Sequence, residues 1–302
     1  MSAATPTLSK TAPTVNAPAL SLSVPRRRGP APARVVAFVI LALLAASWLT
    51  PVLWAALTSF KNEAEAAAMP VTIVPESGFT LQAYINVLSE GLVPRWAWNS
   101  LLTSAAVTLI TVTISALAGY ALSRLRFAGR QMLITLIVAS IMIPGQILIV
   151  PLFHLMLSLN LVDTYWGIIL PQVVAAPMVF ILKKFFDQIP FALEEAALMD
   201  GASRLRIFWS IVLPLSRPIL GAVAIFVFIG AWNNFLWPFI VVNDANLMTL
   251  PTGLQTVISA YGIQYAQNMA QAVLAALPLI VVFMFFQRQI IKGIATTGIA
   301  GT

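Results

Sequence analysis

Charged residues, cysteine and histidine are scarce in this chain of 302 residues. Lys, Arg, Asp and Glu together make up 9% of it, cysteine is absent, and His154 is its single histidine. The lack of cysteine excludes disulfide bonds, a thiolate nucleophile and a Cys-ligated metal. A lone histidine with no Asp, Glu or Cys nearby in the sequence cannot by itself form a triad or a metal site. We therefore predict no catalytic residue and no metal ligand, and the composition disfavours an enzyme.

The sequence also lacks the G-x-x-x-x-G-K-[ST] motif, whose glycine-rich loop cradles the phosphates of a bound nucleotide. No nucleotide site of this kind is therefore expected on this chain.

The chain is instead rich in long apolar segments. Hydrophobic residues make up 60% of it and the mean hydropathy is +0.91, far from the composition of soluble domains. About 20 apolar residues cross the hydrocarbon core of a bilayer. We predict an all-α, polytopic membrane protein with six transmembrane helices at about 35–58, 100–122, 131–153, 166–182, 218–241 and 268–287.

The basic residues indicate how these spans are oriented. All but two of the 17 lysines and arginines lie on the side that holds both termini, the exceptions being Lys61 and Arg95. Because cytoplasmic loops are enriched in Lys and Arg, both termini are predicted to be cytoplasmic. This placement also accounts for the net charge of +7, so no nucleic acid partner is predicted.

The ends of the chain differ in composition from the spans. Residues 1–34 are rich in Ala, Pro, Ser and Thr and are predicted to be a disordered cytoplasmic tail, although their basic end before an apolar stretch also resembles a secretory signal. Residues 35–292 form the six-helix domain, and 293–302 a short cytoplasmic tail.

The six predicted spans have no Asp, Glu, Lys, Arg or His in their middle. An ion-coupled carrier commonly uses such groups, so energy for transport is expected from elsewhere. The polar side chains that could line a pathway are amides, which could also bond helix to helix. These candidates are Gln146, Gln172, Asn233 and Asn234.

Prolines and tryptophans mark further features of the spans. Pro144-Gly145 should break the third span, and Pro171 and Pro177 the fourth, either as gating joints or as packing features. Trp96 and Trp98, at the start of the second span, are typical of an interfacial belt, with a sugar-stacking surface as the alternative.

A polar segment between the fourth and fifth spans has the pattern of two short helices that meet at a glycine. Pro190 is suited to open a helix and Gly201 to close it. The residues between them favour a helix and include the carboxylates Glu194 and Glu195. Ser203 can cap a second, basic helix that leads back to the membrane. We interpret this segment as a docking site.

The spacing of this segment resembles the signature loop of permease subunits of binding-protein-dependent ABC importers. The matched positions are Glu195-Ala196-Ala197, Gly201, Ile211 and Leu213-Pro214. Further stretches are similar to the carbohydrate branch, with its six-span, maltose-type permeases: Ser59-Phe60-Lys61, Asn99-Ser100-Leu101, Asp200-Gly201-Ala202, Trp232-Asn233-Asn234-Phe235 and Phe286-Gln287-Arg288. Together these cover most of residues 35–301 and imply the type I permease fold of ABC importers.

The resemblance implies a permease subunit of the bacterial cytoplasmic (inner) membrane that forms half of the translocation pathway for a sugar or oligosaccharide. The partners it implies are a second permease, two ATPase subunits that bind ATP and Mg, and an extracytoplasmic substrate-binding protein. No cofactor is expected on this chain. The loop 187–214 would dock the ATPase through Glu194, Glu195, Ala196, Ala197, Asp200, Gly201, Ala202, Ile211, Leu213 and Pro214.

Alternatives remain at this point. A secondary, ion-coupled carrier would need charged groups inside the spans, whereas a structural membrane subunit would not need the register of the loop. A polyol such as glycerol phosphate stays open as the substrate, because permeases for such compounds look alike at this level.

Overall fold

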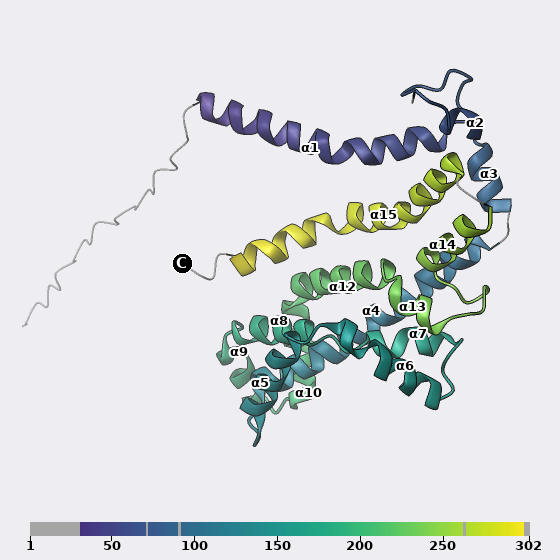
Figure 1. The fold of residues 1–302 in the computed structure, drawn as a ribbon. Coiled ribbons are helices and arrows are strands. Elements are labelled where there is room, and N and C mark those ends of the chain that lie inside the picture. The colour runs from purple at the N-terminus through teal and green to yellow at the C-terminus, as the bar shows by residue number, and fades with distance from the viewer. Residues whose placement is uncertain (1–30, 71, 90–91, 262–263, 299–302) are drawn as a thin grey trace, which may run out of the picture. The chain divides into compact units, whose positions relative to one another are not determined.

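The computed structural model describes residues 31–70, 72–89, 92–261 and 264–298 (Figure 1). The contacts divide the chain into two parts, residues 1–50 and 51–302, and each is described by itself. Helix α1, Ala31–Ser59, begins in the first part and ends in the second. The described residues contain helices and no strand, as predicted. Most of the predicted N-terminal tail, residues 1–30, lies outside the described residues.

Helix α4, Val93–Arg124, is the longest helix that lies wholly within the second part apart from α15, and it carries much of the packing. It follows two short helices, α2 (Glu63–Ala66) and α3 (Gln82–Ser89). A Cβ added at Gly119 of α4 would lie 3.1 Å from the backbone nitrogen of Lys183 in α8. The absence of a side chain at Gly119 therefore lets α4 and α8 approach closely.

Three pairs of helices are joined at a sharp bend. Two of the pairs coincide with the predicted third and fourth spans, whereas the last joins the end of the predicted loop 187–214 to the predicted fifth span. The pairs bend by 95° between Arg130–Ile141 and Gly145–Ser158, by 48° between Tyr165–Gln172 and Ala176–Asp187, and by 80° between Arg204–Leu215 and Arg217–Trp232. Their elements are α5 (Arg130–Ile141), η1 (Gly145–Leu148), α6 (Ile149–Ser158), α7 (Tyr165–Ile169), η2 (Leu170–Gln172), α8 (Ala176–Asp187), α10 (Arg204–Ile207), η3 (Phe208–Val212), α11 (Leu213–Leu215) and α12 (Arg217–Trp232).

The predicted breaks fall close to these bends. The 95° bend lies at Pro144-Gly145, as expected for residues that interrupt the hydrogen-bond ladder of a helix. Pro171 lies within η2, whereas Pro177 is tolerated in the first turn of α8, where its missing N–H is not needed. The break in the fourth span is thus confirmed, but Pro177 starts a helix rather than breaking one.

The predicted fifth span, 218–241, is not one continuous helix. Helix α12 ends at Trp232 and α13 covers Leu236–Val241. Asn234 causes the interruption by offering the backbone another partner, since its Oδ1 accepts a hydrogen bond from the backbone N–H of Trp237. Two helices follow, α14 (Leu250–Tyr261) and α15 (Tyr265–Gly298).

Three described helices are long and apolar enough to cross a membrane: Pro32–Ser59, Val93–Arg124 and Tyr265–Phe285. If each bent pair is one crossing, the described helices make six spans. This number agrees with the prediction from hydropathy.

The two ends of α4 lie in different clusters of buried residues. Near Arg124, the apolar core includes Tyr120, Phe186 and Phe208 and lies beside α9 (Phe191–Met199). Near Val93, the core joins α3, α4, α14 and α15. We refer to these as the α9 end and the α14 end of the bundle.

Candidate docking site

The polar segment after α8 folds as the sequence predicts. Helix α9 starts directly after Pro190 and ends at Met199. Gly201 has a φ of +78°, a conformation that glycine adopts at little cost, and the backbone N–H of Ala202 donates to the carbonyl of Ala197 at 2.9 Å. This geometry closes α9 and turns the chain sharply. Ser203 then caps α10 by accepting a hydrogen bond from the backbone N–H of Arg206.

The two neighbouring glutamates of α9 have opposite environments. Glu194 is fully buried, whereas Glu195 is exposed. Consecutive helical residues point about 100° apart, so adjacent positions can face the core and the solvent respectively. Glu195 therefore stays accessible to a partner, while Glu194 contacts only this chain.

Two arginines surround the Glu194 carboxylate. Arg124 Nε, at the end of α4, lies 3.0 Å from Glu194 Oε1, and Arg204 Nη1 lies 3.6 Å from Oε2. The Arg124 contact is an ion pair without a directed hydrogen bond. The Tyr120 hydroxyl lies 3.5 Å from Oε2. A buried carboxylate requires such counter-charges, because water no longer solvates it.

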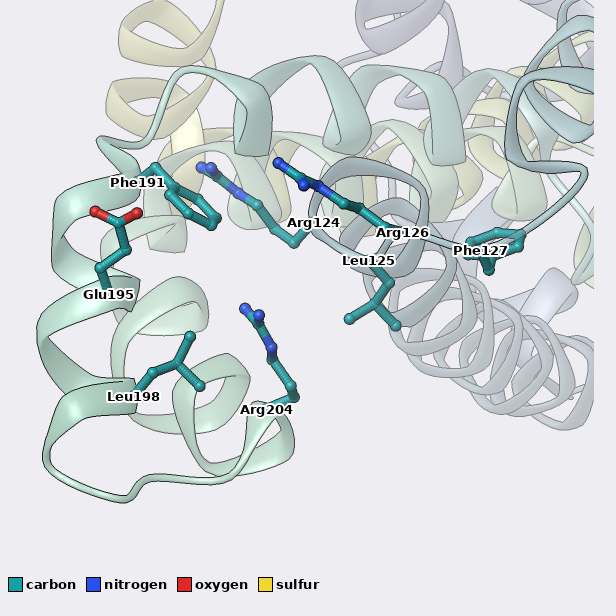
Figure 2. Close-up of a pocket in the computed structure, with 8 residues that line it drawn as sticks. All are labelled: Arg124, Leu125, Arg126, Phe127, Phe191, Glu195, Leu198 and Arg204. Atoms are coloured by element: carbon teal, nitrogen blue, oxygen red, sulfur yellow. The ribbon is translucent and has the colours of Figure 1, made fainter.

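A recess of about 650 Å³ opens beside this ion cluster (Figure 2). Guanidinium groups, one carboxylate and apolar side chains line it. Its residues are Arg124, Leu125, Arg126, Phe127, Phe191, Glu195, Leu198 and Arg204. The recess thus places the exposed Glu195 beside basic side chains from two separate segments of the chain, the end of α4 and the start of α10.

The other predicted docking residues divide between surface and core. Ala196, Asp200, Gly201 and Pro214 are exposed. Ala197, Ala202, Ile211 and Leu213 are partly buried and pack against the core near Phe208. The structure brings the acidic helix and the turn at Gly201 together on one surface and uses the apolar positions to attach them to the bundle.

Among the predicted pathway residues, Gln172 and Asn234 lie together. Asn234 Nδ2 donates to Gln172 Oε1 at 2.7 Å, and Gln172 Nε2 donates to the carbonyl of Ile168 at 2.8 Å. Gln146 and Asn233 are exposed, although Asn233 directly precedes Asn234 in the sequence. Asn234 and Gln172 therefore bond helix to helix, one of the two roles that the sequence allowed, whereas Asn233 presents a free surface.

Trp96 and Trp98 have different roles. Trp98 is 60% exposed, as an interfacial residue would be. Trp96 is 2% exposed, and its Nε1–H donates to the carbonyl of Ala245 at 2.7 Å. The interfacial interpretation thus suits Trp98, while Trp96 is a core residue at the α14 end.

His154 is exposed, and the described residues contain no cluster of His, Cys, Asp or Glu able to hold a metal.

The sequence analysis missed the roles of Arg124 and Arg130, which it treated only as markers of topology. Arg124 Nη2 donates to the carbonyls of Phe186 and Ile189, the latter at 2.5 Å. Arg130 Nε donates to the carbonyl of Leu122 at 2.8 Å, at the last turn of α4. The spacing of Tyr120 and Arg124, four residues apart on one helical face, is the only hint in the sequence.

Apolar helices that are long enough to cross a membrane or are bent in pairs, with the polar helix α9 anchored at one end of α4, define a polytopic membrane protein. The chain belongs to the family of binding-protein-dependent transport system inner membrane components, whose family model matches residues 111–296. The resemblance in the signature loop therefore reflects membership, and the chain is an ABC transporter permease.

Similar proteins and structures support this assignment. The arabinooligosaccharides transport system permease protein AraQ of Halalkalibacterium halodurans is 37% identical over 88% of this chain and 95% of its own length. The sn-glycerol-3-phosphate transport system permease protein UgpE of Yersinia pestis is 37% identical over 65% of this chain and 70% of its own. A chain of a bacterial ABC transporter involved in alginate import has the same fold, with a TM-score of 0.77 over 85% of this chain and 95% of that chain, at 23% identity.

Proposed function

We propose that this chain is the permease half of an ATP-driven importer for a sugar or oligosaccharide. Its family membership and its similarity to an arabinooligosaccharide permease over almost the whole length support this function. The single observation that carries the coupling role is α9, a short helix with the exposed Glu195, closed by Gly201 at a positive φ and anchored to the end of α4.

The α9 end is the cytoplasmic end in this proposal, since the basic residues gather there. A partner ATPase binds α9, with Glu195 pairing with a basic residue of that subunit. ATP and Mg bind there and not on this chain. A second permease completes the pathway, two ATPase subunits dock from the cytoplasm, and a substrate-binding protein delivers the sugar from outside.

Transport then follows from a change in the position of α9. Closure of the two ATPase subunits around ATP displaces the docking helices, and the spans move from an inward-facing to an outward-facing arrangement. Nucleotide drives the change because it binds the closed ATPase pair more tightly than the open one. The exposed amides of Asn233 and Gln146 offer hydrogen bonds to a polar substrate.

The test is purification of the tagged chain from its native membrane, with mass spectrometry of the copurifying proteins and an ATPase assay. We expect a second permease, an ATPase and a binding protein. Glu195→Lys should remove the ATPase while the permease stays in the membrane, and Glu195→Gln should weaken its binding less. Recovery of this chain alone, under conditions that keep a known importer intact, would instead favour a stand-alone carrier or a structural subunit.

The substrate class is tested on the copurified binding protein. Sugar oligomers such as arabinooligosaccharides should raise its melting temperature. The similarity to a glycerol-3-phosphate permease supports a second candidate. If sn-glycerol-3-phosphate stabilises the binding protein and sugars do not, the importer carries a polyol phosphate and the proposed substrate is wrong.

A further inference from the structure

Docking of a partner does not explain the buried Glu194, because its carboxylate does not reach the solvent-exposed face of α9. It is fully buried, although Glu195 beside it is exposed. Its neighbours come from two separate elements: Arg124 and Tyr120 belong to α4, and Arg204 to α10. One charged group on the docking helix thus contacts both a long span and the helix that follows the glycine turn.

Arg124 extends this contact to a third element. Its Nε faces Glu194 at 3.0 Å, while its Nη2 donates to the carbonyls of Phe186 and Ile189 at the end of α8 and just beyond it. Its side chain is only 7% exposed. A single guanidinium group therefore joins the ends of α4 and α8 to the docking helix.

A second set of bonds stiffens the same corner. Ser123 Oγ and Asp187 Oδ1 lie 2.8 Å apart in a hydrogen bond between α4 and α8. Arg130 donates to the carbonyls of Leu122 and Ser123 and so satisfies groups that are left unpaired at the end of a helix. The end of α4 to which Glu194 is attached is thus itself fixed in position.

Stability alone does not account for a buried charge at this place. Apolar residues of similar volume often stabilise a protein as well as a buried ion pair does. Ala197 and Leu198 of α9 already pack against the apolar core. Apolar contacts are non-directional, however, and allow one helix to roll or slide on another. An ion pair flanked by hydrogen bonds holds one register, which is the best-supported use of buried polar groups.

We propose that Glu194 is a positioning residue that couples the docking helix to α4 and α8, so that a displacement of α9 is passed on to the spans. The inference rests on the proposed function. In this division of roles, Glu195 binds the ATPase, while Glu194 transmits the movement and takes no part in that binding.

The experiment compares these neighbouring residues in the complete importer, reconstituted in liposomes with its ATPase and binding protein. Glu194→Leu replaces the carboxylate with an apolar side chain and so removes the charge. It should copurify with the ATPase as the wild type does and hydrolyse ATP, yet move at least ten-fold less substrate per ATP. The matched control Glu195→Lys should lose the ATPase from the complex.

A distance measurement reports on position directly. Because the chain has no cysteine, spin labels can be placed at Ala128→Cys, after α4, and Ala192→Cys, on α9, both of which are exposed. With Glu194 intact, the distance between the labels should be the same with and without ATP. In Glu194→Leu the distribution should broaden. Glu194→Gln carries the same test if the leucine variant does not reach the membrane.

Two results would overturn the inference. One is a Glu194→Leu importer with wild-type transport per ATP and an unchanged distance between the labels. The other is a correctly inserted Glu194→Leu permease that fails to bind the ATPase, which would make Glu194 part of the docking contact. Failure of the proposed function is a separate outcome, since then the wild-type chain itself would not copurify with an ATPase.

Discussion

Asn234 donates a hydrogen bond from Nδ2 to Oε1 of Gln172 at 2.7 Å, joining the segment after α12 to the segment between α7 and α8. One bond between amides thus connects the two places where these helices are interrupted. We predict that Gln172→Ala and Asn234→Ala each lower the free energy of unfolding, by about 1–2 kcal/mol, and that the double variant loses less than the sum. Thermal unfolding in detergent measures this coupling, and strictly additive losses would contradict it.

Asn233 should behave differently from its neighbour Asn234. Its side chain is exposed, so removing the amide leaves no buried group without a partner. Asn233→Ala should leave the melting temperature within the error of the wild type but raise the KM for uptake several-fold if the amide binds substrate. Uptake assays in vesicles test this, with Gln146→Ala, also exposed, as the comparison. An unchanged KM in both variants would remove these amides from the pathway.

The effect of a substitution at Gly201 should depend on how readily the new residue adopts a positive φ. A Cβ at this position would meet no atom within 4 Å, so the cost comes from the positive φ alone. Gly201→Val should cost about 1–2 kcal/mol locally and reduce ATPase binding, whereas Gly201→Asn should retain most of it. Gly145→Ala, at a site with equal space and no positive φ, is the control and should bind the ATPase normally. Equal binding by the valine and asparagine variants would contradict the argument.

Gly253 of α14 packs directly against the ring of Trp96, and a Cβ there would overlap the indole atoms. Gly253→Ala should therefore destabilise the α14 end by about 1–3 kcal/mol, as overpacking does. Gly230→Ala, in α12 with open space around it, should instead be neutral or slightly stabilising. Melting temperatures of the two variants distinguish these outcomes, and a neutral Gly253→Ala would show that Trp96 can move aside.

Asp163 connects two loops in a pH-dependent manner. The backbone N–H groups of Asn243 and Asp244 donate to its carboxylate and hold the pKa of Asp163 below its usual range. A lowered pKa means that the charged form stabilises the fold above the ordinary value of about 3.9, and that the contribution disappears as the pH falls through the lowered pKa. The difference in melting temperature between wild type and Asp163→Asn should be constant from about pH 7 to 5 and shrink in stronger acid. A difference in melting temperature that already shrinks between pH 7 and pH 5 would contradict this.

The spans could be predicted from the sequence because apolar length and charge placement relate directly to the bilayer. The turn at Gly201 and the cap at Ser203 were predictable for a similar reason, since both depend on local backbone chemistry. Which of the two glutamates lies in the core was not predictable. The answer depends on the position of Arg124 in the folded structure. No periodic pattern in the residues between Arg124 and Glu194 indicates that the two side chains lie side by side.

The interruption at Asn234 was missed for a related reason. An apolar stretch around Trp232-Asn233-Asn234 satisfies hydropathy whether or not the helix continues, and Asn234 also bonds to Gln172, which lies far away in the sequence. In the same way, the sequence around Trp96 is typical of the membrane interface, but in the fold Gly253 packs against its ring. Tertiary contacts, not local preferences, determined these positions.

The ion cluster at Glu194 also bears on how the protein is made. Glu194 leaves the ribosome long after Arg124, and Arg204 follows later still. A carboxylate is costly to bury before its counter-charges are present. Helix α9 can therefore settle only after α4 has been inserted and α10 has been synthesised. The order of synthesis thus delays the final placement of α9 on the bundle until its flanking segments are present.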